Sequence, residues 1–280
     1  MDGVVIGAGT MGLGIAYVLA AAGDAVTVVE PDDRRARAAR TRIAEVAQGA
    51  VRRGRLGPED AGALVGRIVF RSSLDQVEAT NPALVVEAVP ERLELKRTVL
   101  RAAEALEPRM LATNTSGLSI DAIAEGLTDP ASFIGLHFFN PVWAMPLVEI
   151  VRGSATDEPT LRSARELVAR IGKESIVVKD TPGFATSRLG VALGLEAMRM
   201  LEEGVGEAAD IDRAMELGYR HPMGPLRLTD LVGLDVRLDI ARHLAETYGP
   251  RFAPPRILEE KVARGELGKK SGRGFYDWSE

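Results

Sequence analysis

A histidine and a glutamate in two neighbouring apolar segments are the residues of this chain best suited to chemistry. His137 is one of only three histidines among 280 residues and lies in the segment FIGLHFF (133–139). Glu149 lies in the segment PLVEI (146–150), and the proline-containing insert between the two segments favours a turn. The segments are therefore predicted to pair as antiparallel strands, in which facing side chains lie roughly 4.5–5.5 Å apart at Cβ.

Such a pair would have a chemical use. A carboxylate accepts one imidazole N–H and fixes the tautomer, which leaves the other ring nitrogen able to act as a general base near neutral pH. The competing interpretation is a strand-end histidine beside a solvated glutamate, since His–Glu pairs are common. These two segments alone leave both interpretations open.

A nucleotide site is indicated at the start of the chain. Residues 3–6 predict a short strand, GAGTMG (7–12) follows, and an Ala/Leu-rich helical segment then runs to about Gly23. This order is the dinucleotide-binding fingerprint in its required context: the first glycine permits a tight turn, the second admits the pyrophosphate, and the third lets helix pack on strand. The helix N-terminus would face the phosphates. The residues predicted to contact the cofactor in this loop are Gly7, Gly9, Thr10, Met11 and Gly12.

An acidic residue follows the second predicted strand. Residues 25–29 are apolar and end at Glu30, which lies roughly 20 residues beyond the loop, where an acid can take the ribose hydroxyls. The fingerprint alone fits a nicotinamide or a flavin dinucleotide. Glu30 would repel a 2′-phosphate, so NAD is favoured over NADP, although Arg34 and Arg35 close behind would soften that preference.

The pattern of elements predicts an α/β fold of the Rossmann type, with a doubly wound, mostly parallel sheet, followed by a smaller all-α domain. The polar Pro-Gly stretch at 179–183 precedes helix-only patterning, which predicts an NAD-binding domain over 1–182 and a helical domain over 183–280. Helices are predicted at 31–55, 91–106, 158–171, 184–203, 207–217, 226–247 and 255–264, and further strands at 68–70, 83–87, 110–114 and 175–178.

Polar residues follow the strand predicted at 110–114. In an open parallel sheet, ligands collect beyond the carboxyl ends of the strands, where Asn114, Thr115 and Ser116 would lie. The serines and the threonine of this stretch could equally cap a helix predicted at 120–125. Both interpretations stand at this point.

Composition excludes several classes of protein. The net charge is −5 and the basic residues are dispersed, which argues against nucleic-acid or anionic-membrane binding. The absence of cysteine excludes disulfides, thiol nucleophiles and Cys-type zinc sites, and fits a reducing cytosol. No metal site is predicted. The uncharged stretch 3–23 is not a membrane span, because glycines interrupt it. The small helical domain is predicted to pack on a partner subunit.

An ordered series of motifs covers nearly the whole chain. It resembles the short-chain L-3-hydroxyacyl-CoA dehydrogenases, the group that includes 3-hydroxybutyryl-CoA dehydrogenase. The order of the motifs is far more specific than any one of them. The motifs are GAGTMG, EAVPERLELK, NTSGLSI, GLHFFNPVWAMPLVEI, DTPGFATSRLG, HPMGPLRLTDLVGLD and GKKSGRGFYDW.

The resemblance implies roles for individual residues. His137 matches the general base, Glu149 its orienting carboxylate, and Ser116 the serine that binds the reacting oxygen of the substrate beside the nicotinamide. Arg53 falls where the family places a basic residue for the CoA phosphates, although its helix carries little motif. The residues outside the glycine loop that are expected to contact NAD are Glu30, Glu91, Lys96, Asn114, Ser116, Asn140 and Lys270.

One departure from the family pattern concerns the segment GFATSR. The family commonly has Asn before this Arg, whereas this chain has Ser187. A hydroxyl still donates a hydrogen bond but is shorter than an amide. Ser187 is therefore expected to assist catalysis and to bind substrate, and the preferred acyl chain is left open.

The expected reaction is hydride transfer between C3 of an (S)-3-hydroxyacyl-CoA and NAD, with 3-hydroxybutyryl-CoA as the first candidate substrate. Two alternatives remain: an NAD-dependent dehydrogenase of a free hydroxy acid, such as a sugar acid or carnitine, and a non-catalytic NAD-binding protein. The protein is further expected to be a cytoplasmic homodimer that joins through its helical domain and binds neither nucleic acid nor membrane.

Overall fold

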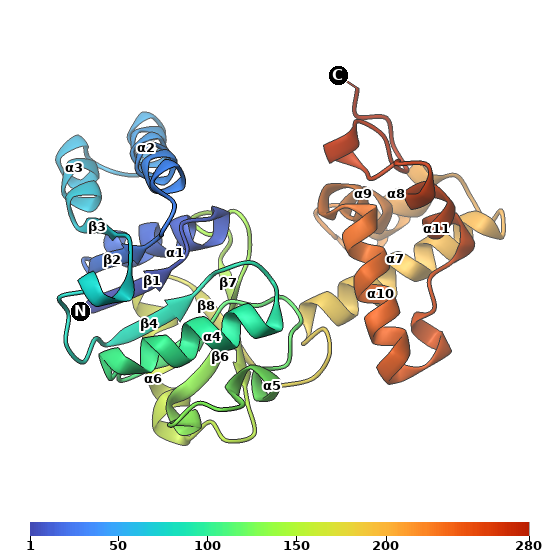
Figure 1. The fold of residues 1–280 in the computed structure, drawn as a ribbon. Coiled ribbons are helices and arrows are strands. Elements are labelled where there is room, and N and C mark those ends of the chain that lie inside the picture. The colour runs from blue at the N-terminus through green and yellow to red at the C-terminus, as the bar shows by residue number, and fades with distance from the viewer. Residues whose placement is uncertain (280) are drawn as a thin grey trace. The chain divides into compact units, whose positions relative to one another are not determined.

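The structure is a computed structural model that describes residues 1–279. The chain forms two compact units, unit 1 (Met1–Asp180) and unit 2 (Thr181–Glu280). Within the described residues, unit 1 contains one eight-stranded sheet with the strand order β3-β2-β1-β4-β5-β6-β7-β8 (Figure 1). The strands are β1 (Asp2–Ile6), β2 (Ala25–Val29), β3 (Ile68–Arg71), β4 (Leu84–Glu87), β5 (Leu111–Thr113), β6 (Phe133–Phe138), β7 (Leu147–Arg152) and β8 (Glu174–Lys179).

The predicted doubly wound, mostly parallel sheet is confirmed. Strands β1 to β6 pair in parallel, β7 pairs antiparallel with β6, and β8 runs parallel to β7. The central strands are buried along almost their whole length because helices cover both faces, and such strands are nearly continuous apolar runs. The carboxyl ends of β1, β4 and β5 therefore open at one edge of the sheet.

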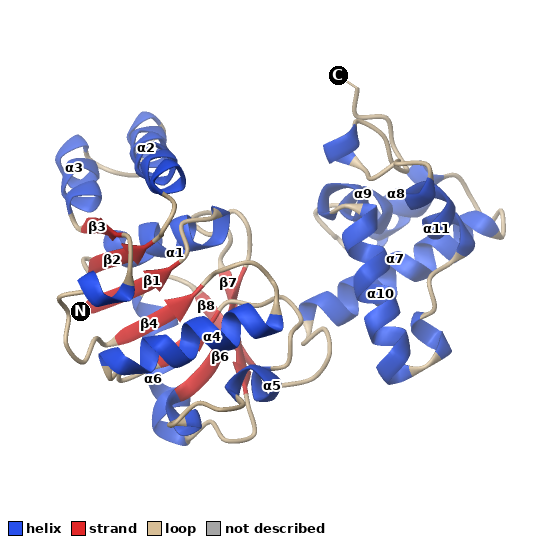
Figure 2. Cartoon of the chain, viewed as in Figure 1, coloured by secondary structure: helices blue, strands red, loops and turns tan. Residues whose placement is uncertain are grey.

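Helices cover the sheet of unit 1 (Figure 2). Helix α1 packs on β1 and β2, α6 packs on β6 to β8, and α4 contacts β4 and lies in front of the sheet in Figure 1. The helices of this unit are α1 (Thr10–Ala21), α2 (Asp33–Arg52), α3 (Pro58–Gly66), α4 (Leu93–Ala103), α5 (Ile120–Ala124) and α6 (Glu158–Arg170), with short 3-10 turns at Leu74–Gln76, Glu104–Leu106 and Pro130–Ser132.

The helix predicted at 31–55 is shorter, and another helix follows it. The carboxylate of Asp32 accepts hydrogen bonds from the N–H groups of Arg34 and Arg35, so α2 begins only after this cap. Helix α3 was not predicted. It begins at Pro58, whose missing N–H costs nothing in the first turn of a helix.

Unit 2 is helical, as predicted, with one correction. The single helix predicted at 226–247 is two helices, α9 and α10, which are separated at Gly233. The φ of Gly233 is +106°, a backbone conformation that an L-residue rarely adopts and that ends the first helix. The helices of this unit are α7 (Thr186–Glu202), α8 (Ala208–Gly218), α9 (Pro225–Val232), α10 (Leu234–Tyr248) and α11 (Arg256–Ala263), with 3-10 turns at Pro250–Phe252 and Lys269–Ser271.

Unit 2 has its own apolar core, built mainly from the inward faces of α7 and α10. Phe275 and Tyr276 of the C-terminal tail pack against this core, so the tail is docked and not loose. No helix within residues 1–279 combines the length and the apolar character that crossing a membrane requires.

Candidate active site

The imidazole of His137 meets the carboxylate of Glu149 inside the sheet. The two residues face each other directly in the antiparallel register of β6 and β7, and Nδ1 lies 2.6 Å from Glu149 Oε2. Glu149 is 0% exposed and His137 is 7% exposed. The predicted contact is confirmed, and the alternative of a solvated glutamate is wrong.

Packing holds this pair in one geometry. Every residue of β6 is buried, and the ring of Phe139 lies 4.3 Å from the imidazole, centroid to centroid. Because Nδ1 faces the carboxylate, Nε2 is the ring nitrogen on the opposite side of the imidazole. An imidazole held in this way has its tautomer set by the acid, and Nε2 is then the atom that can exchange a proton.

The glycine loop has the geometry that a dinucleotide requires. Gly7 has a φ of +99°, and a Cβ at this position would lie 2.9 Å from the carbonyl oxygen of Ala88. A Cβ at Gly12 would lie 1.9 Å from the carbonyl oxygen of Gly7, so helix and loop touch there. A Cβ at Gly9 would have no neighbouring heavy atom within 4 Å, which leaves open space where a pyrophosphate would approach the N-terminus of α1.

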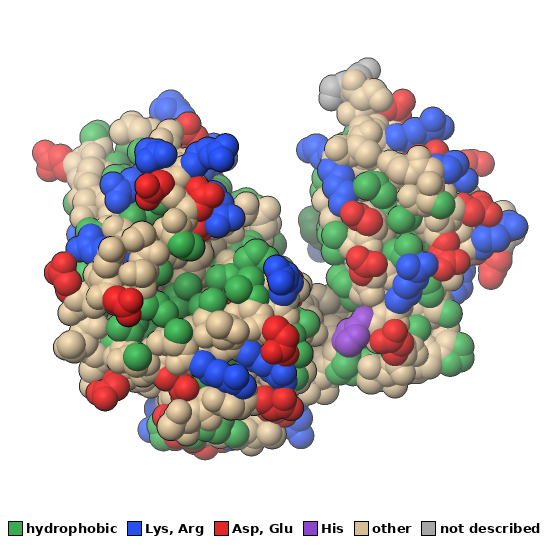
Figure 3. All heavy atoms as spheres, in the orientation of Figure 1, with side chains coloured by type: hydrophobic (Ala, Val, Ile, Leu, Met, Phe, Trp, Pro, Cys, Tyr) green, Lys and Arg blue, Asp and Glu red, His purple; other side chains and the backbone are tan. Residues whose placement is uncertain are grey.

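A cleft of about 580 Å³ adjoins this loop. It is lined by Gly7, Gly9, Thr10 and Met11, and by apolar residues at the end of β4 and along α4. Figure 3 shows apolar side chains gathered in a hollow on the visible face of unit 1, with charged side chains around it. An apolar cleft with a few polar groups is typical of a cofactor site.

Glu30 lies at the end of β2 and also lines the cleft. It is buried, and its carboxylate accepts hydrogen bonds from the N–H groups of Ala8 (3.1 Å) and Asp32 (3.0 Å). The guanidinium of Arg35 pairs with the same carboxylate at 2.9 Å. Glu30 is therefore fixed where a ribose would bind, and Arg35 partly neutralises it.

Lys96 has a different environment from the one that the resemblance implies. Its side chain is 0% exposed, and its ammonium lies 2.8 Å from Glu87 Oε1, in an ion pair whose acid is equally buried. Burial raises the pKa of Glu87, and the ammonium of Lys96 opposes that shift. In the structure Lys96 has no exposed surface, and its ammonium is held by Glu87 and by the carbonyl oxygen of Asn114.

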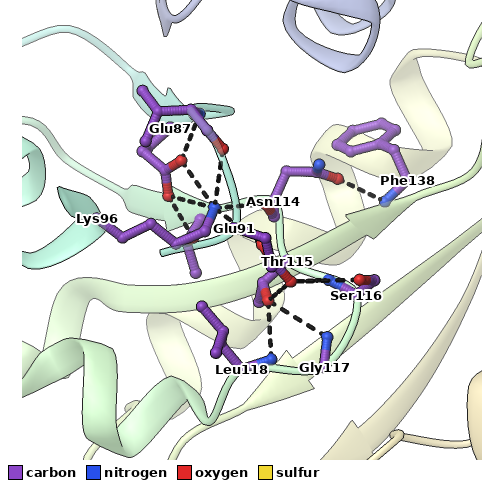
Figure 4. A network of polar contacts seen from close by, with 11 residues as sticks. Glu87, Glu91, Lys96, Asn114, Thr115, Ser116, Gly117, Leu118 and Phe138 are labelled. Carbon is purple, nitrogen blue, oxygen red and sulfur yellow. Dashed lines mark hydrogen bonds and ion pairs between the residues drawn. The ribbon is translucent and has the colours of Figure 1, made fainter. Parts of the chain in front are cut away.

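The loop after β5 gathers its polar groups around Glu91 (Figure 4). Glu91 Oε1 accepts hydrogen bonds from the hydroxyl of Thr115 (2.6 Å) and from the N–H of Ser116 (2.9 Å). Asn114 Oδ1 accepts the N–H of Phe138 and so ties this loop to the end of β6. The helix cap is Ser119, whose hydroxyl accepts the N–H of Ala122. Ser116 therefore belongs to the Glu91 cluster and is not the cap of α5.

Two further predicted residues lie in unit 1. Asn140 lines a second cavity, of about 660 Å³, together with Gly9 and Thr10. It is therefore near the glycine loop, as a cofactor contact requires. Arg53 is exposed at the C-terminal end of α2; burial raises the pKa of Tyr17, and the charge of Arg53 partly opposes that shift.

Two predicted residues belong to unit 2. Ser187 lies in the first turn of α7. The ammonium of Lys270 lies 2.5 Å from Asp235 Oδ1, and both side chains are partly exposed. Burial raises the pKa of Asp235, but the hydrogen bond and the charge of Lys270 outweigh it together with backbone hydrogen bonds, so the pKa is lowered overall.

Sequence analysis missed Glu87 and Thr113. Thr113 Oγ1 donates a 2.6 Å hydrogen bond to Glu87 Oε2, and both residues are fully buried. A signal was available for Glu87, because it is an acid at the carboxyl end of a predicted apolar strand. An acid in that position is rarely buried without a partner. Such a residue is therefore a candidate for a functional site.

Comparisons with known proteins agree with this geometry. The family model described as "3-hydroxyacyl-CoA dehydrogenase, NAD binding domain" matches residues 3–181, and the model of the C-terminal domain of the same family matches residues 183–278. The chain is 40% identical to a 3-hydroxybutyryl-CoA dehydrogenase of Mycobacterium tuberculosis, over 98% of this chain and 97% of that protein. It is 37% identical to the mitochondrial hydroxyacyl-coenzyme A dehydrogenase of Sus scrofa, over 98% of this chain and 90% of that protein.

A solved structure supports the same assignment. The crystal structure of the (S)-3-hydroxybutyryl-CoA dehydrogenase PaaH1 from Ralstonia eutropha matches with a TM-score of 0.95 and 35% identity, and the match covers 100% of this chain and 99% of that one. The family models together span almost all of the chain. The chain therefore belongs to the 3-hydroxyacyl-CoA dehydrogenase family, with an NAD-binding domain followed by the C-terminal domain of that family.

Proposed function

We propose that this protein interconverts (S)-3-hydroxyacyl-CoA and 3-ketoacyl-CoA with NAD as the hydride carrier, and that 3-hydroxybutyryl-CoA is its substrate. The observation that carries the proposal is the buried pair of His137 and Glu149, joined at 2.6 Å in the sheet that also carries the glycine loop. Family membership supplies the reaction class, and this pair supplies the base that the reaction needs.

The pair would act on the substrate hydroxyl. NAD, when bound, supplies the acceptor for the hydride that leaves C3. In that step Nε2 of His137 takes the hydroxyl proton, and the carboxylate of Glu149 stabilises the imidazolium that forms. In the reverse direction the imidazolium returns the proton to the ketone oxygen. Oxidation releases a proton overall and reduction consumes one, so higher pH should favour oxidation and lower pH should favour reduction.

The remaining residues would bind and orient the two ligands. Ser116, assisted by Ser187, holds the reacting oxygen, and Arg53 binds the phosphates of CoA. Glu30 takes the ribose hydroxyls, and the glycine loop receives the pyrophosphate at the N-terminus of α1. Further cofactor contacts are proposed for Glu91, Asn114, Asn140 and Lys270.

The test is the turnover of His137→Gln. The amide keeps the approximate size of the ring but cannot act as the base, so kcat should fall by about 10²–10⁴-fold. A matched control is His243→Gln, which alters a half-exposed histidine of α10 that lies 3.9 Å from Glu246. The control should keep the activity of the unsubstituted protein. NADH absorbance would be followed with acetoacetyl-CoA, with longer 3-ketoacyl-CoAs and with free acetoacetate.

Three results would contradict the proposal. A kcat for His137→Gln within a few-fold of the original value would remove His137 as the base. Equal turnover of the free acid and the CoA thioester would favour a dehydrogenase of free hydroxy acids. Tight NADH binding without turnover of any of these compounds would leave only a cofactor-binding protein.

We also propose that the protein is a homodimer joined through unit 2. Helix α9 exposes Leu228, Leu231 and Val232, which are spaced so that they share one helix face, and Val236 of α10 is exposed as well. Exposed apolar patches of this kind mark interaction surfaces. Light scattering should give twice the chain mass, and Leu231→Asp should halve it. The absence of cysteine supports a cytoplasmic location.

A further inference from the structure

An ion pair with no exposed surface lies beneath the loop that carries Ser116. Lys96 Nζ lies 2.8 Å from one carboxylate oxygen of Glu87 and 3.1 Å from the other. The same carboxylate accepts the hydroxyl of Thr113 at 2.6 Å and the N–H of Val89 at 2.6 Å. Burying two charges is costly unless good geometry and further hydrogen bonds satisfy them, and this pair meets both conditions.

The ammonium of Lys96 joins three segments that are separate in the sequence. Lys96 belongs to α4, and its ion pair reaches Glu87 at the end of β4. A third contact, of 3.0 Å, reaches the carbonyl oxygen of Asn114 directly after β5. A lysine ammonium suits this position because its three donors can point in three directions. The backbone from which Ser116 projects is therefore fixed to α4 and β4.

A second route leads from Lys96 to the hydroxyl of Ser116 (Figure 4). Lys96 Nζ lies 3.4 Å from Glu91 Oε2, and Glu91 Oε1 accepts both the N–H of Ser116 (2.9 Å) and its hydroxyl (3.2 Å). The Glu91 side chain is 41% exposed, so Lys96 is the buried charge that orients it. One cation thus acts on both the backbone and the side chain of Ser116.

We propose that Glu87 and Lys96 are positioning residues for Ser116 during hydride transfer, acting through Glu91 and through the Asn114 carbonyl. The inference rests on the proposed function, in which Ser116 holds the reacting oxygen. Both side chains are fully enclosed, and together they keep the serine within the small tolerance that hydride transfer allows. A displacement of about 1 Å in such a group costs about 10²-fold in rate.

A purely structural pair would behave differently. If the pair only joined α4 to the sheet, its loss would lower the melting temperature, and the folded fraction would keep its kcat. If it positions Ser116, its loss lowers kcat in protein that is still folded and still binds NADH. The two cases are separated by kinetics in combination with a Ser116 substitution.

The experiment is a double-mutant cycle between the pair and Ser116. The Glu87→Gln/Lys96→Met protein removes both charges together, so that no unpaired ion is left buried. It should reduce acetoacetyl-CoA with a kcat about 10²-fold lower at saturating NADH, in protein that still binds NADH by fluorescence. Placed on Ser116→Ala, the same change should lower kcat by less than about threefold, because the group being positioned is already gone.

Other outcomes would overturn the inference. If the effects of the pair and of Ser116→Ala multiply, or if kcat of the double variant stays within a few-fold, the pair is structural only. Failure of the proposed function itself is recognised separately, because the unsubstituted protein would then not turn over acetoacetyl-CoA at all.

A milder pair of variants keeps the test decisive if the double variant does not fold. Thr113→Val removes one hydrogen bond to Glu87 and keeps the shape of the side chain, whereas Thr113→Ser keeps the hydroxyl. The valine variant should lose about 3–10-fold in kcat without a matching change in the Kd for NADH, and the serine variant should restore it. Equal kcat for the two variants would contradict the positioning role.

Discussion

Buried carboxylates have different structural roles in the two units. Glu87 in unit 1 and Asp230 in unit 2 are both 0% exposed, and each accepts several hydrogen bonds. Glu87 pairs with the cation Lys96, next to the loop that carries Ser116. Among residues 1–279, the donors to Asp230 are neutral and come from the C-terminal tail, residues 275–278.

The difference shows that the location of a buried acid decides its use. Glu87 ends a central strand, so the groups that it fixes lie at the edge of the sheet where ligands bind. Asp230 lies on α9, and the groups that it fixes are the backbone of Phe275 and Tyr276 and the indole of Trp278. In unit 2 the hydrogen bonds to this carboxylate therefore hold the tail in place, in a helical unit that is too small to have a large apolar core.

The buried cations differ as well. Lys96 is satisfied by Glu87, whereas Arg237 on α10 is 6% exposed and its Nε has no hydrogen-bond partner among residues 1–279. Burial lowers the pKa of Arg237 from 12.5 to about 10. The charge of Lys96 is thus paired with an acid, whereas the charge of Arg237 is destabilised by its loss of solvent.

The largest effect is expected for Asp230→Ala. The substitution leaves three partly buried donors without their acceptor, and hydrogen bonds to a charged group are worth about 1.5–3 kcal/mol each but are not additive. The free energy of unfolding should fall by about 3 kcal/mol, and Trp278 should become accessible to a fluorescence quencher. Asp230→Asn, which keeps one acceptor oxygen, should lose less. Unchanged quenching would show that apolar packing alone holds the tail.

The next largest effect is expected for Arg237→Met. Replacing a buried guanidinium whose Nε has no hydrogen-bond partner among residues 1–279 by an apolar side chain of similar length should raise the free energy of unfolding by about 2 kcal/mol. A lowered pKa means that the folded protein binds this proton less tightly than the unfolded chain does. The gain should therefore be full below pH 10 and shrink as the pH rises further.

Denaturant titrations at pH 7 and pH 10.5 measure this gain. Arg237→Lys is the control, since it keeps a charge in the same place and should bring little improvement. A destabilised methionine variant would show that the contacts of the guanidinium outweigh its loss of solvation, and the contrast with Lys96 would then disappear.

Much of the site could be predicted from sequence because local rules govern it. Two apolar segments around a proline-containing turn allowed one strand pairing, and that pairing brings His137 opposite Glu149. The glycine spacing of the first loop reflects steric requirements that any chain must meet, such as the contact between Gly12 and Gly7. The sheet and the helical second unit follow from periodicity in the same way.

The remaining features depend on contacts that no local pattern reveals. Glu91 lies just before α4 and Lys96 within it, and the resemblance suggested a ligand for both, so only the folded structure shows that Lys96 is enclosed. Apolar periodicity continues through Gly233, so the break between α9 and α10 was missed, because a positive φ leaves no mark in a hydrophobic pattern.

The smallest effect is expected for Glu266→Gln. This substitution removes an ion pair near the surface of unit 2, for comparison with the buried pair of Glu87 and Lys96 in unit 1. Hydrogen bonds from Lys261 (2.9 Å) and Arg264 (3.3 Å) lower the pKa of Glu266 to about 2. Its stabilising contribution is therefore fully present above the ordinary value of 4.5 and is lost as the pH falls towards 2. Since solvent screens such groups, Glu266→Gln should cost less than about 1 kcal/mol at pH 7 and nothing near pH 2. Urea titrations across this range measure the difference, and a cost that persisted at the lowest pH would mean that the side chain acts through packing and not through its charge.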